Sequence, residues 1–414
     1  MIDFTKLLPS MESGQELITA LSIIPKYDES ICEQDQTARL VALSDLYQIY
    51  IPSQMSLEIY SKLYLALLRS MQKKGTQMAI KQRYENYKAI QQQSYSGILG
   101  GSDSFTIIGT SGIGKSSAIS RSISLITENQ IIETDKPYTK IIPCLIVQCP
   151  FDSSVKGLLL EILRKVDEGL GTDHYHHAIT SRAATTDMLI GAVSSIALNH
   201  IGMLVVDEIQ NVANSKNGKN LIGALTQLIN NSGISICMVG TPECTVFFEQ
   251  AMQLARRSVG LYYTAMSYDE YFQSFCKVLF QYQYTRQKTE ITPAITEWLY
   301  EHSAGVISVV VSLVHDAQEI AILTGKEVLN LEILNEAYQQ ILSLLHGYIK
   351  PAVNQNKPTS RKKNSAASVR KKPIQSNVRQ DGYSISDMVE KSRAERSDIV
   401  ELLKEICTIV EVAI

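Results

Sequence analysis

Apolar residues in the first hundred positions recur at helical spacing. Pro52 and Ser53 precede one such stretch, and a serine at this place can cap a helix. The apolar residues that follow predict a helix with one buried face: Leu57, Ile59, Leu63, Leu67 and Leu68. The segment 91–104 is polar and contains glycine, so we interpret it as a connector.

From residue 105 the pattern changes to short, continuous apolar runs that alternate with helical stretches. The runs are 105–109 (FTIIG), 141–149 (IIPCLIVQC), 201–207 (IGMLVVD), 234–240 (ISICMVG) and 260–266 (GLYYTAM). Continuous apolar runs are typical of parallel strands that are covered on both faces. We therefore expect an α/β fold in which a parallel five-stranded sheet is flanked by helices.

Helical periodicity returns after residue 266. Thr292 and Pro293 form a favourable helix start, with a capping hydroxyl and a proline in the first turn. Near the end of the chain one apolar stripe recurs at helical spacing: Ile399, Leu402, Leu403, Ile406 and Val410. The expected organisation is a helical N-terminal region 1–100, an α/β core 101–266, a helical lid 267–349, a basic disordered linker 350–382 and a C-terminal amphipathic helix 383–414.

Composition narrows the class of protein. Apolar residues make up 45% of the chain and charged residues 20%, as in ordinary globular proteins. We see no apolar run of about 18 residues and no leader peptide, so we expect no membrane partner. Seven cysteines without a CxxC pair favour a reducing, cytoplasmic location. The net charge is −3, but the stretch 357–372 holds seven basic residues and no acidic ones.

The stretch GTSGIGKSS directly follows the first apolar run and fits GxxxxGK[ST] at every fixed position. In this pattern a strand ends, the backbone wraps around a phosphate, and a helix begins whose amides face the anion. Lys115 would reach the β- and γ-phosphates, and the Ser116 hydroxyl would bind Mg²⁺. A nucleoside triphosphate is thus expected to contact Gly109, Thr110, Ser111, Gly112, Ile113, Gly114, Lys115, Ser116 and Ser117.

An acidic pair ends the apolar run MLVVDE. A strand of this kind carries the acids to the carboxyl edge of the sheet, where ligands bind. Asp207 would hold Mg²⁺, mostly through water, and Glu208 would polarise the attacking water. Positioning and charge neutralisation are the main requirements of phosphoryl transfer, and these groups provide both.

Polar residues adjoin each of the last two apolar runs, 234–240 and 260–266. Thr241, in VGTPE, is either a sensor for the γ-phosphate or a simple turn residue before Pro242. Arg256 and Arg257, in ARRS, are either surface residues or the source of an arginine that reaches a neighbouring subunit's nucleotide. Such an arginine contributes about 10³–10⁵ in rate.

The set GTSGIGKSS, MLVVDE, ICMVGTPE and ARRS, followed by a helical lid, resembles an AAA+ ATPase. More narrowly, LVVDEIQNV, GISICMVGTPE, LARR and HSAGVISVVVSLVHDAQEIAI resemble the TnsC/TniB family, the ATP-dependent regulators of bacterial transposons. The resemblance covers about 50–345. One departure lies in SAGVISVVVS, where many AAA+ lids carry an arginine that senses the nucleotide and this chain has none.

The resemblance implies that ATP and Mg²⁺ bind between subunits of a homo-oligomer, a ring or a helical filament on double-stranded DNA. A target-site protein of the TniQ/TnsD type, in some systems with a CRISPR complex, would recruit it. The oligomer would activate the transposase subunits, and hydrolysis would disassemble it. Thr241 would then be a sensor for the γ-phosphate, and either Arg256 or Arg257 would be the arginine that reaches the neighbouring subunit's nucleotide.

The resemblance also implies where DNA binds, because relatives contact DNA with the segment after the second strand. The candidates there are Lys156, Lys165 and Arg182, with Arg164, Thr185 and Thr186 as second choices.

Other interpretations of the same motifs stay open. The chain is alternatively a helicase loader or initiator, or a signalling or defence ATPase that binds no DNA. The basic stretch 357–372 either touches DNA or keeps the chain soluble. The final amphipathic helix either docks on a partner such as a transposase subunit or packs on its own core.

Overall fold

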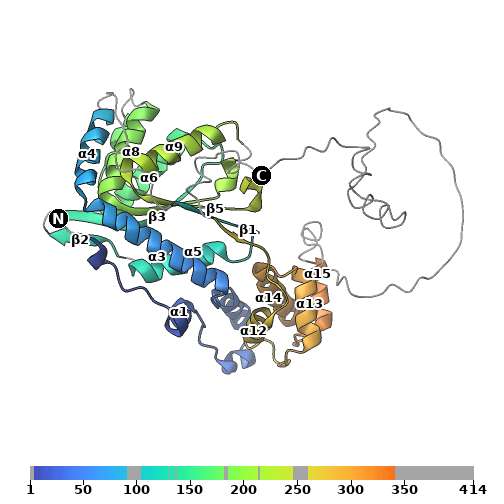
Figure 1. Ribbon diagram of the computed structural model, residues 1–414. Coiled ribbons are helices and arrows are strands. Elements are labelled where there is room, and N and C mark those ends of the chain that lie inside the picture. Colours follow the sequence, from blue (N-terminus) through green and yellow to red (C-terminus); the bar gives the residue numbers. More distant parts are fainter. Residues whose placement is uncertain are drawn as a thin grey trace, which may run out of the picture. The chain divides into compact units, whose positions relative to one another are not determined.

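A computed structural model describes residues 4–90, 104–128, 130–135, 138–180, 185–212, 215–245 and 260–340 (Figure 1). All of these residues belong to one compact unit, Met1–Asn354. The expected linker 350–382 and C-terminal helix 383–414 lie outside the described residues, as does the end of the expected lid.

A six-stranded sheet forms the centre of the molecule, in the order β2-β3-β4-β5-β1-β6. The predicted parallel five-stranded sheet is confirmed. Its strands are β1 (Phe105–Gly109), β3 (Tyr138–Gln148), β4 (Ile201–Asp207), β5 (Ser235–Gly240) and β6 (Leu261–Tyr263). All five run parallel, with β1 between β5 and β6.

The sixth strand, β2 (Ile132–Asp135), pairs antiparallel with the start of β3. Its sequence, IETD, contains a single apolar residue, which explains why the apolar pattern does not predict it. Its pairing covers only positions 138–141 of β3. Among the described residues, the later part of β3 is therefore the edge of the parallel sheet.

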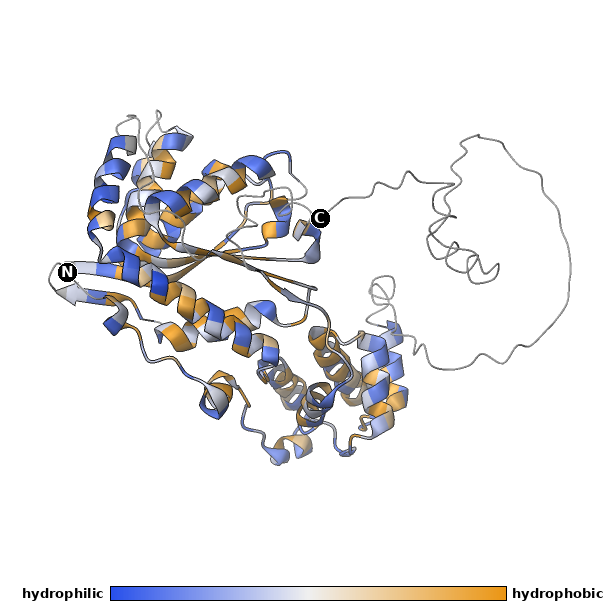
Figure 2. Ribbon diagram, viewed as in Figure 1, coloured by the Kyte–Doolittle hydropathy of each residue, from blue (hydrophilic) through white to orange (hydrophobic). Residues whose placement is uncertain are grey.

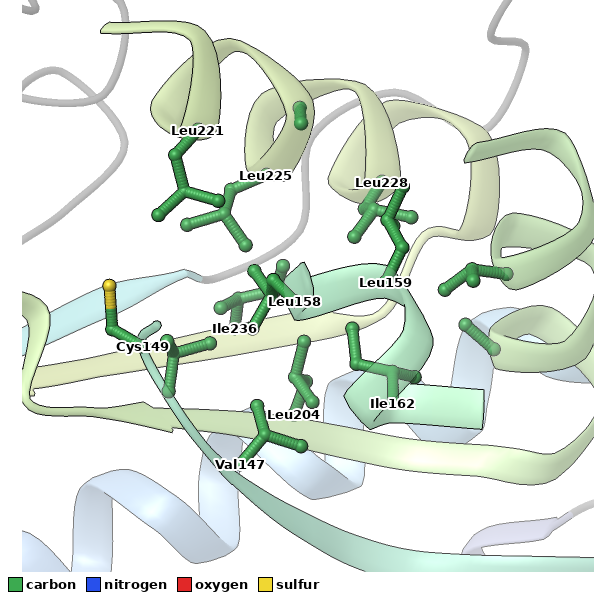
Figure 3. Packing of buried hydrophobic residues seen from close by; sticks show 14 of the residues in the cluster. Val147, Cys149, Leu158, Leu159, Ile162, Leu204, Leu221, Leu225, Leu228 and Ile236 are labelled. Atoms are coloured by element: carbon green, nitrogen blue, oxygen red, sulfur yellow. The ribbon is translucent and has the colours of Figure 1, made fainter. Parts of the chain in front are cut away.

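Helices cover both faces of the sheet, as expected for parallel strands. One face is covered by α6 (Val155–Leu170), α8 (Thr186–His200) and α9 (Gly218–Ser232). Figure 3 shows leucines of α6 and α9 turned toward Val147, Leu204 and Ile236 of the strands. The other face is covered by α3 (Gln54–Lys74) and α5 (Lys115–Thr127). The apolar sides of these helices meet the sheet in both layers (Figure 2).

The N-terminal region is built into the rest of the unit. Ser53 begins α3 with a capping box to Ser56, as its position predicts, and Ile59, Leu63 and Leu67 are fully buried against the sheet. The preceding elements are short: η1 (Phe4–Leu7), α1 (Gly14–Leu21), η2 (Glu29–Glu33), α2 (Gln36–Ala42) and η3 (Leu43–Gln48). The following helix, α4 (Gln77–Ile90), packs on α8. The domain boundaries expected at 100 and 266 stay predictions.

A second, all-helical core holds α12 (Glu270–Leu279), α13 (Pro293–Ser303), α14 (Ile307–Thr324) and α15 (Leu331–Gln340), which we call the lid. Thr292 caps α13 by accepting a hydrogen bond from the Ile295 amide. α14 is long and apolar enough to cross a membrane by length and composition alone, but 56% of its residues are buried within the protein. Its apolar side packs into the lid core, which explains its composition.

Residues 23–50, which we call the strap, leave the sheet domain, pack on the lid and return. Leu43, Leu46 and Ile49 of the strap belong to the lid core. The fully buried Arg39 forms two hydrogen bonds to the Glu327 carboxylate, one of 2.5 Å from Nη1 and one of 2.8 Å from Nη2. Its Nη1 also donates to the Tyr284 carbonyl at 3.3 Å. The guanidinium beside it lowers the pKa of the Glu327 carboxyl.

Removal of the Arg39 charge is expected to destabilise the protein strongly. Arg39→Met leaves the Glu327 carboxylate, whose side chain is 16% exposed, with the Arg286 amide as its remaining donor, and we expect a cost of about 3 kcal/mol, the low end for a broken buried pair. Lys288→Met is the matched control, because Lys288 pairs with Glu29 at the exposed surface of the same strap and should cost less than about 1 kcal/mol. Urea denaturation measures both. Equal losses in the two variants would contradict a structural role for the buried pair.

Candidate nucleotide-binding site

The phosphate loop lies where β1 ends and α5 begins, at the carboxyl edge of the sheet. Gly112 and Gly114 take φ values of +81° and +95°, which side chains with a Cβ rarely adopt. Gly109 lies so close to β6 that a Cβ there would be 2.7 Å from the Tyr263 carbonyl oxygen. Ile113 is buried and anchors the loop in the core. The loop is therefore a fixed cup, shaped by its glycines.

Lys115 is the first residue of α5 and turns back over the loop. Its Nζ donates to the Gly109 carbonyl at 2.7 Å and to the Thr110 carbonyl at 2.9 Å. Burial lowers the pKa of the ammonium, while the carboxylates of Asp207 and Glu208 act in the opposite direction. The charge is thus held inside the cup, where a phosphate can exchange for the carbonyl oxygens.

The acidic pair lies at the end of β4, which is separated from β1 by β5 in the sheet. The Asp207 carboxylate accepts a hydrogen bond of 2.8 Å from the Glu208 amide. Glu208 has a φ of +57°, a strained conformation for a residue other than glycine. Its carboxylate accepts a hydrogen bond from Nε2 of Gln210, so the group expected to polarise water is held by a neighbour in this structure.

Gln210 also connects the acidic pair to the end of β5. Its Oε1 accepts a hydrogen bond of 3.3 Å from the Thr241 amide. The Thr241 hydroxyl donates a hydrogen bond of 3.2 Å to the Glu243 carboxylate. Sequence reasoning did not select Gln210, because only the strand order shows that it lies between Glu208 and Thr241.

A cavity of about 260 Å³ joins these groups. Its walls are Ser111, Gly112, Gly114, Lys115, Ser116, Ser117, Asp207, Glu208, Gln210, Gly240, Thr241 and Ser308. The hydroxyl of Ser116 and the carboxylate of Asp207 are hard oxygen donors of the kind that Mg²⁺ prefers. The donor set and the glycine-shaped cup therefore fit a phosphate group with Mg²⁺.

A second cavity of about 220 Å³ opens beside the first and shares Gly112, Gly114, Ser117 and Ser308 with it. Its remaining walls are mostly apolar and come from the strap and the start of α3, from the phosphate loop, and from the lid and the segment before it: Leu46, Tyr47, Ile49, Tyr50, Ile51, Ser53, Met55, Ser56, Ile113, Met266, Tyr271, Phe275, Ile307, Val311 and Ser312. An apolar slot next to a phosphate cup suits the flat base of a nucleotide. No single motif marks these residues, since they come from separate parts of the sequence.

The lid touches the phosphate loop directly. The Ser308 amide, in the first turn of α14, donates to the Gly112 carbonyl at 3.1 Å. A Cβ on Gly112 would lie 2.3 Å from Oγ of Ser308 and 2.9 Å from Val306. This first turn occupies the region where the sensing arginine of other AAA+ lids is expected. Here a backbone amide makes the contact with the loop.

Two of the three residues expected to bind DNA, Lys156 and Lys165, are described by the structure. Arg182 lies outside the described residues, as do Arg256 and Arg257. Lys156 and Lys165 are nine residues apart on α6, which places them on opposite sides of the helix. Arg164 is engaged by Glu161 and Glu168.

Thr185 caps α8 by accepting a hydrogen bond of 3.3 Å from the Met188 amide, and Thr186 begins that helix. Thr185 thus has a structural role at this helix end, and the part of both threonines in DNA contact stays a prediction.

Gly112→Ala is expected to disturb both the loop and its contact with the lid. The positive φ alone costs about 1–2 kcal/mol, and the approach to Ser308 and Val306 adds a steric clash. Gly171→Ala is the matched control, with a φ of +69° and open space around its Cβ. Urea denaturation should show the larger loss for Gly112→Ala, and titration with a fluorescent ATP analogue should show weaker binding in that variant alone. Similar behaviour of the two variants would refute the tight contact.

Comparison with known proteins finds one family model that matches the core. Residues 101–262 match the model of the bacterial TniB protein family. These residues include five of the six strands in full, the phosphate loop and the acidic pair, and most of β6. No curated protein is significantly similar to the chain in sequence.

Solved structures with a similar arrangement include the ORC1 protein of Aeropyrum pernix in complex with DNA, with 13% identity over 64% of each chain and a TM-score of 0.42. The ORC2 protein of the same organism, in ADPNP and ADP complexes, has 15% identity over 63% of this chain and 66% of its own, with a TM-score of 0.38. Drosophila ORC bound to DNA has 13% identity over 82% of this chain and 72% of its own, with a TM-score of 0.44.

The chain thus spans 64% of the length of the ORC1 protein. The family match concerns the residues that form the sheet and the site. The order of the strands, the phosphate loop and its acidic pair agree with this match, so the core of the chain is similar to that of TniB/TnsC-type AAA+ proteins.

Proposed function

We propose that this protein is an ATP-dependent regulator of DNA transposition that works in the bacterial cytoplasm. It assembles as a homo-oligomer on double-stranded DNA and couples a target-site protein of the TniQ/TnsD type to the transposase subunits. Hydrolysis of ATP ends the assembly. The observation that carries the proposal is the TniB match over residues 101–262, the same residues that build the phosphate cup.

The nucleotide chemistry follows from the groups around the cavity. Lys115 binds the β- and γ-phosphates, and Ser116 with Asp207 would hold Mg²⁺, which supplies charge neutralisation when bound. Glu208 orients the attacking water after it leaves Gln210. Thr241 holds the γ-phosphate or the water from the end of β5. The base lies in the apolar slot between strap and lid.

The charge of the site supports an oligomer. Among the described residues that line the phosphate cavity, Lys115 is the one basic side chain. A triphosphate carries several negative charges, so a further cation is needed to stabilise the transition state. Arg256 or Arg257 of a neighbouring subunit would provide it. A complete site would then exist only in the assembled protein, and this links assembly to ATP.

Two variants of the cavity test the nucleotide cycle. Lys115→Ala should lose nucleotide binding and, with it, assembly on DNA. Glu208→Gln should bind ATP, hydrolyse it slowly and stay on DNA, because the amide cannot polarise water. Filaments or rings on duplex DNA are scored by negative-stain microscopy, and phosphate release measures hydrolysis. Rapid release of Glu208→Gln from DNA despite blocked hydrolysis would exclude the proposed role.

DNA contact is tested by the salt dependence of binding. Each lost phosphate contact should lower the slope of log K against log[salt] by about 1. Lys156→Ala, Lys165→Ala and Arg182→Ala are each expected to weaken binding while ATP binding is kept. Since Lys156 and Lys165 lie on opposite sides of α6, the two slopes also show which side faces the duplex. Absence of DNA binding at about 50 mM salt with an ATP analogue would refute the proposed function.

A further inference from the structure

The outer side of β3 is an open edge of the parallel sheet. β2 pairs only with the first residues of β3, and no described strand lies beside the later part. The Cys149 amide donates to the Asp207 carbonyl of β4 at 2.8 Å. Because backbone groups alternate in direction along a strand, the amides and carbonyls of Cys144, Ile146 and Gln148 point away from β4. No group of the described residues bonds to them on that side.

Among the described residues, nothing protects this edge from pairing with another chain. Proteins usually protect an edge strand with charged side chains, with a proline or a bulge in the strand, or with a covering segment. The three outward residues carry no charge, and the prolines of the region, Pro143 and Pro150, stand outside them. The edge is therefore a template for one further strand.

A hollow of about 770 Å³ runs beside this edge. One wall is the end of β3 with the loop that leads to Phe151, and the other is α6 from Gly157 to Lys165. Phe151 is 90% exposed, more than any other large apolar residue described. The hollow thus leaves room beside the edge for the backbone and side chains of another chain.

The side chains of β3 determine what one face of an added strand would meet. Leu145 and Val147 belong to the core beneath α6, so Ile146 between them points to the opposite face of the sheet. Ile146 is 41% exposed there. Apolar, β-branched side chains of an added strand would pack against Ile146, and cross-strand pairs of this kind stabilise a sheet.

The other face of an added strand would meet α6, which brings charge to the hollow. Glu161, Arg164 and Lys165 line it, one anion and two cations. Arg164 is engaged by Glu161 at 2.6 Å, whereas the Lys165 ammonium lies 3.7 Å from the Glu168 carboxylate, a loose pair. An acidic side chain on this face would give Lys165 a closer partner.

We propose that the outer edge of β3 binds an extended peptide of a partner protein, in which apolar and acidic residues alternate. The peptide backbone pairs with the three outward residues of β3. Its apolar side chains pack on Ile146, and its acidic side chains face Lys165. A nucleic acid does not fit this edge, because its backbone has no row of amide donors and carbonyl acceptors. The inference is independent of the proposed function and concerns a surface outside the phosphate cavity.

The first test uses the full chain and a labelled synthetic heptapeptide with blocked ends, in which valine and glutamate alternate. Fluorescence anisotropy measures its binding to the wild type and to two variants. Gln148→Pro removes an outward amide but no hydrogen bond to β4, so the ladder inside the sheet is kept and the affinity should fall about tenfold. Gln148→Ala keeps the amide, and any loss that it shows measures the side chain alone. Equal losses in the two variants, or no binding to the wild type, would overturn the proposal.

Methylated peptides test the pairing on the unchanged protein. A methyl group on the central valine nitrogen blocks pairing if the valine amides face β3, and one on the adjacent glutamate nitrogen blocks it if the glutamate amides do. Neighbouring amides of a strand point in opposite directions, so one methylated peptide should lose binding and the other should keep it. Equal binding of the two peptides would contradict pairing through the backbone.

Further measurements fix the place and the partner. Hydrogen exchange at the amides of Cys144, Ile146 and Gln148 should slow when the peptide binds, and unchanged exchange would refute this site. A peptide with lysine in place of glutamate should bind more weakly, and equal binding would refute the acidic half of the partner. A dimer of the free protein that Gln148→Pro abolishes would assign the edge to a second copy instead. Each of these failures leaves the proposed function standing, because that is tested with nucleotide and DNA.

Discussion

Parallel pairing of β1 with β5 on one side and β6 on the other determines the whole site. Because the strands run in the same direction, their carboxyl ends meet at one edge of the sheet. This pairing places the glycine cup after β1 beside Thr241 after β5, and Asp207 ends β4, one strand further along. The tight passage of Gly109 against Tyr263 of β6 fixes the other side of the cup. The chemistry thus depends on the strand order as much as on the residues of the loop.

The sequence predicts those parts of the fold whose signal is local. Long apolar runs predict the five parallel strands, and the glycines with Lys115 predict the cup. β2 has only one apolar residue and gains its place by pairing with β3, so no local pattern reveals it. The burial of Arg39 depends on Glu327, far away in sequence. Gln210 and Asn211 look like ordinary turn residues until the fold places Thr241 and Cys149 within reach.

The contact between the lid and the phosphate loop differs in its chemistry from the nucleotide-sensing arginine that many AAA+ lids carry. A backbone amide of Ser308 meets the backbone carbonyl of Gly112, so neither partner depends on ionisation or on a long side chain. A guanidinium responds to the charge of a phosphate at a distance, whereas this contact responds to the shape of the loop itself. The lid is therefore suited to detect movement of the loop, whereas the charged group at the loop is Lys115 in the cup.

The strap also limits how the lid can move. Among the described residues the chain passes between sheet domain and lid at Ile23, at Tyr50 and near Met266. The first two passages are joined by a pair of backbone hydrogen bonds of 2.8 and 2.9 Å between Ile23 and Tyr50. A body attached at two points can turn only about the line that joins them. The line from the Ile23–Tyr50 pair to Met266 is therefore the axis about which the lid can turn, and the apolar slot lies along this axis, because Tyr50 and Met266 are both among its walls.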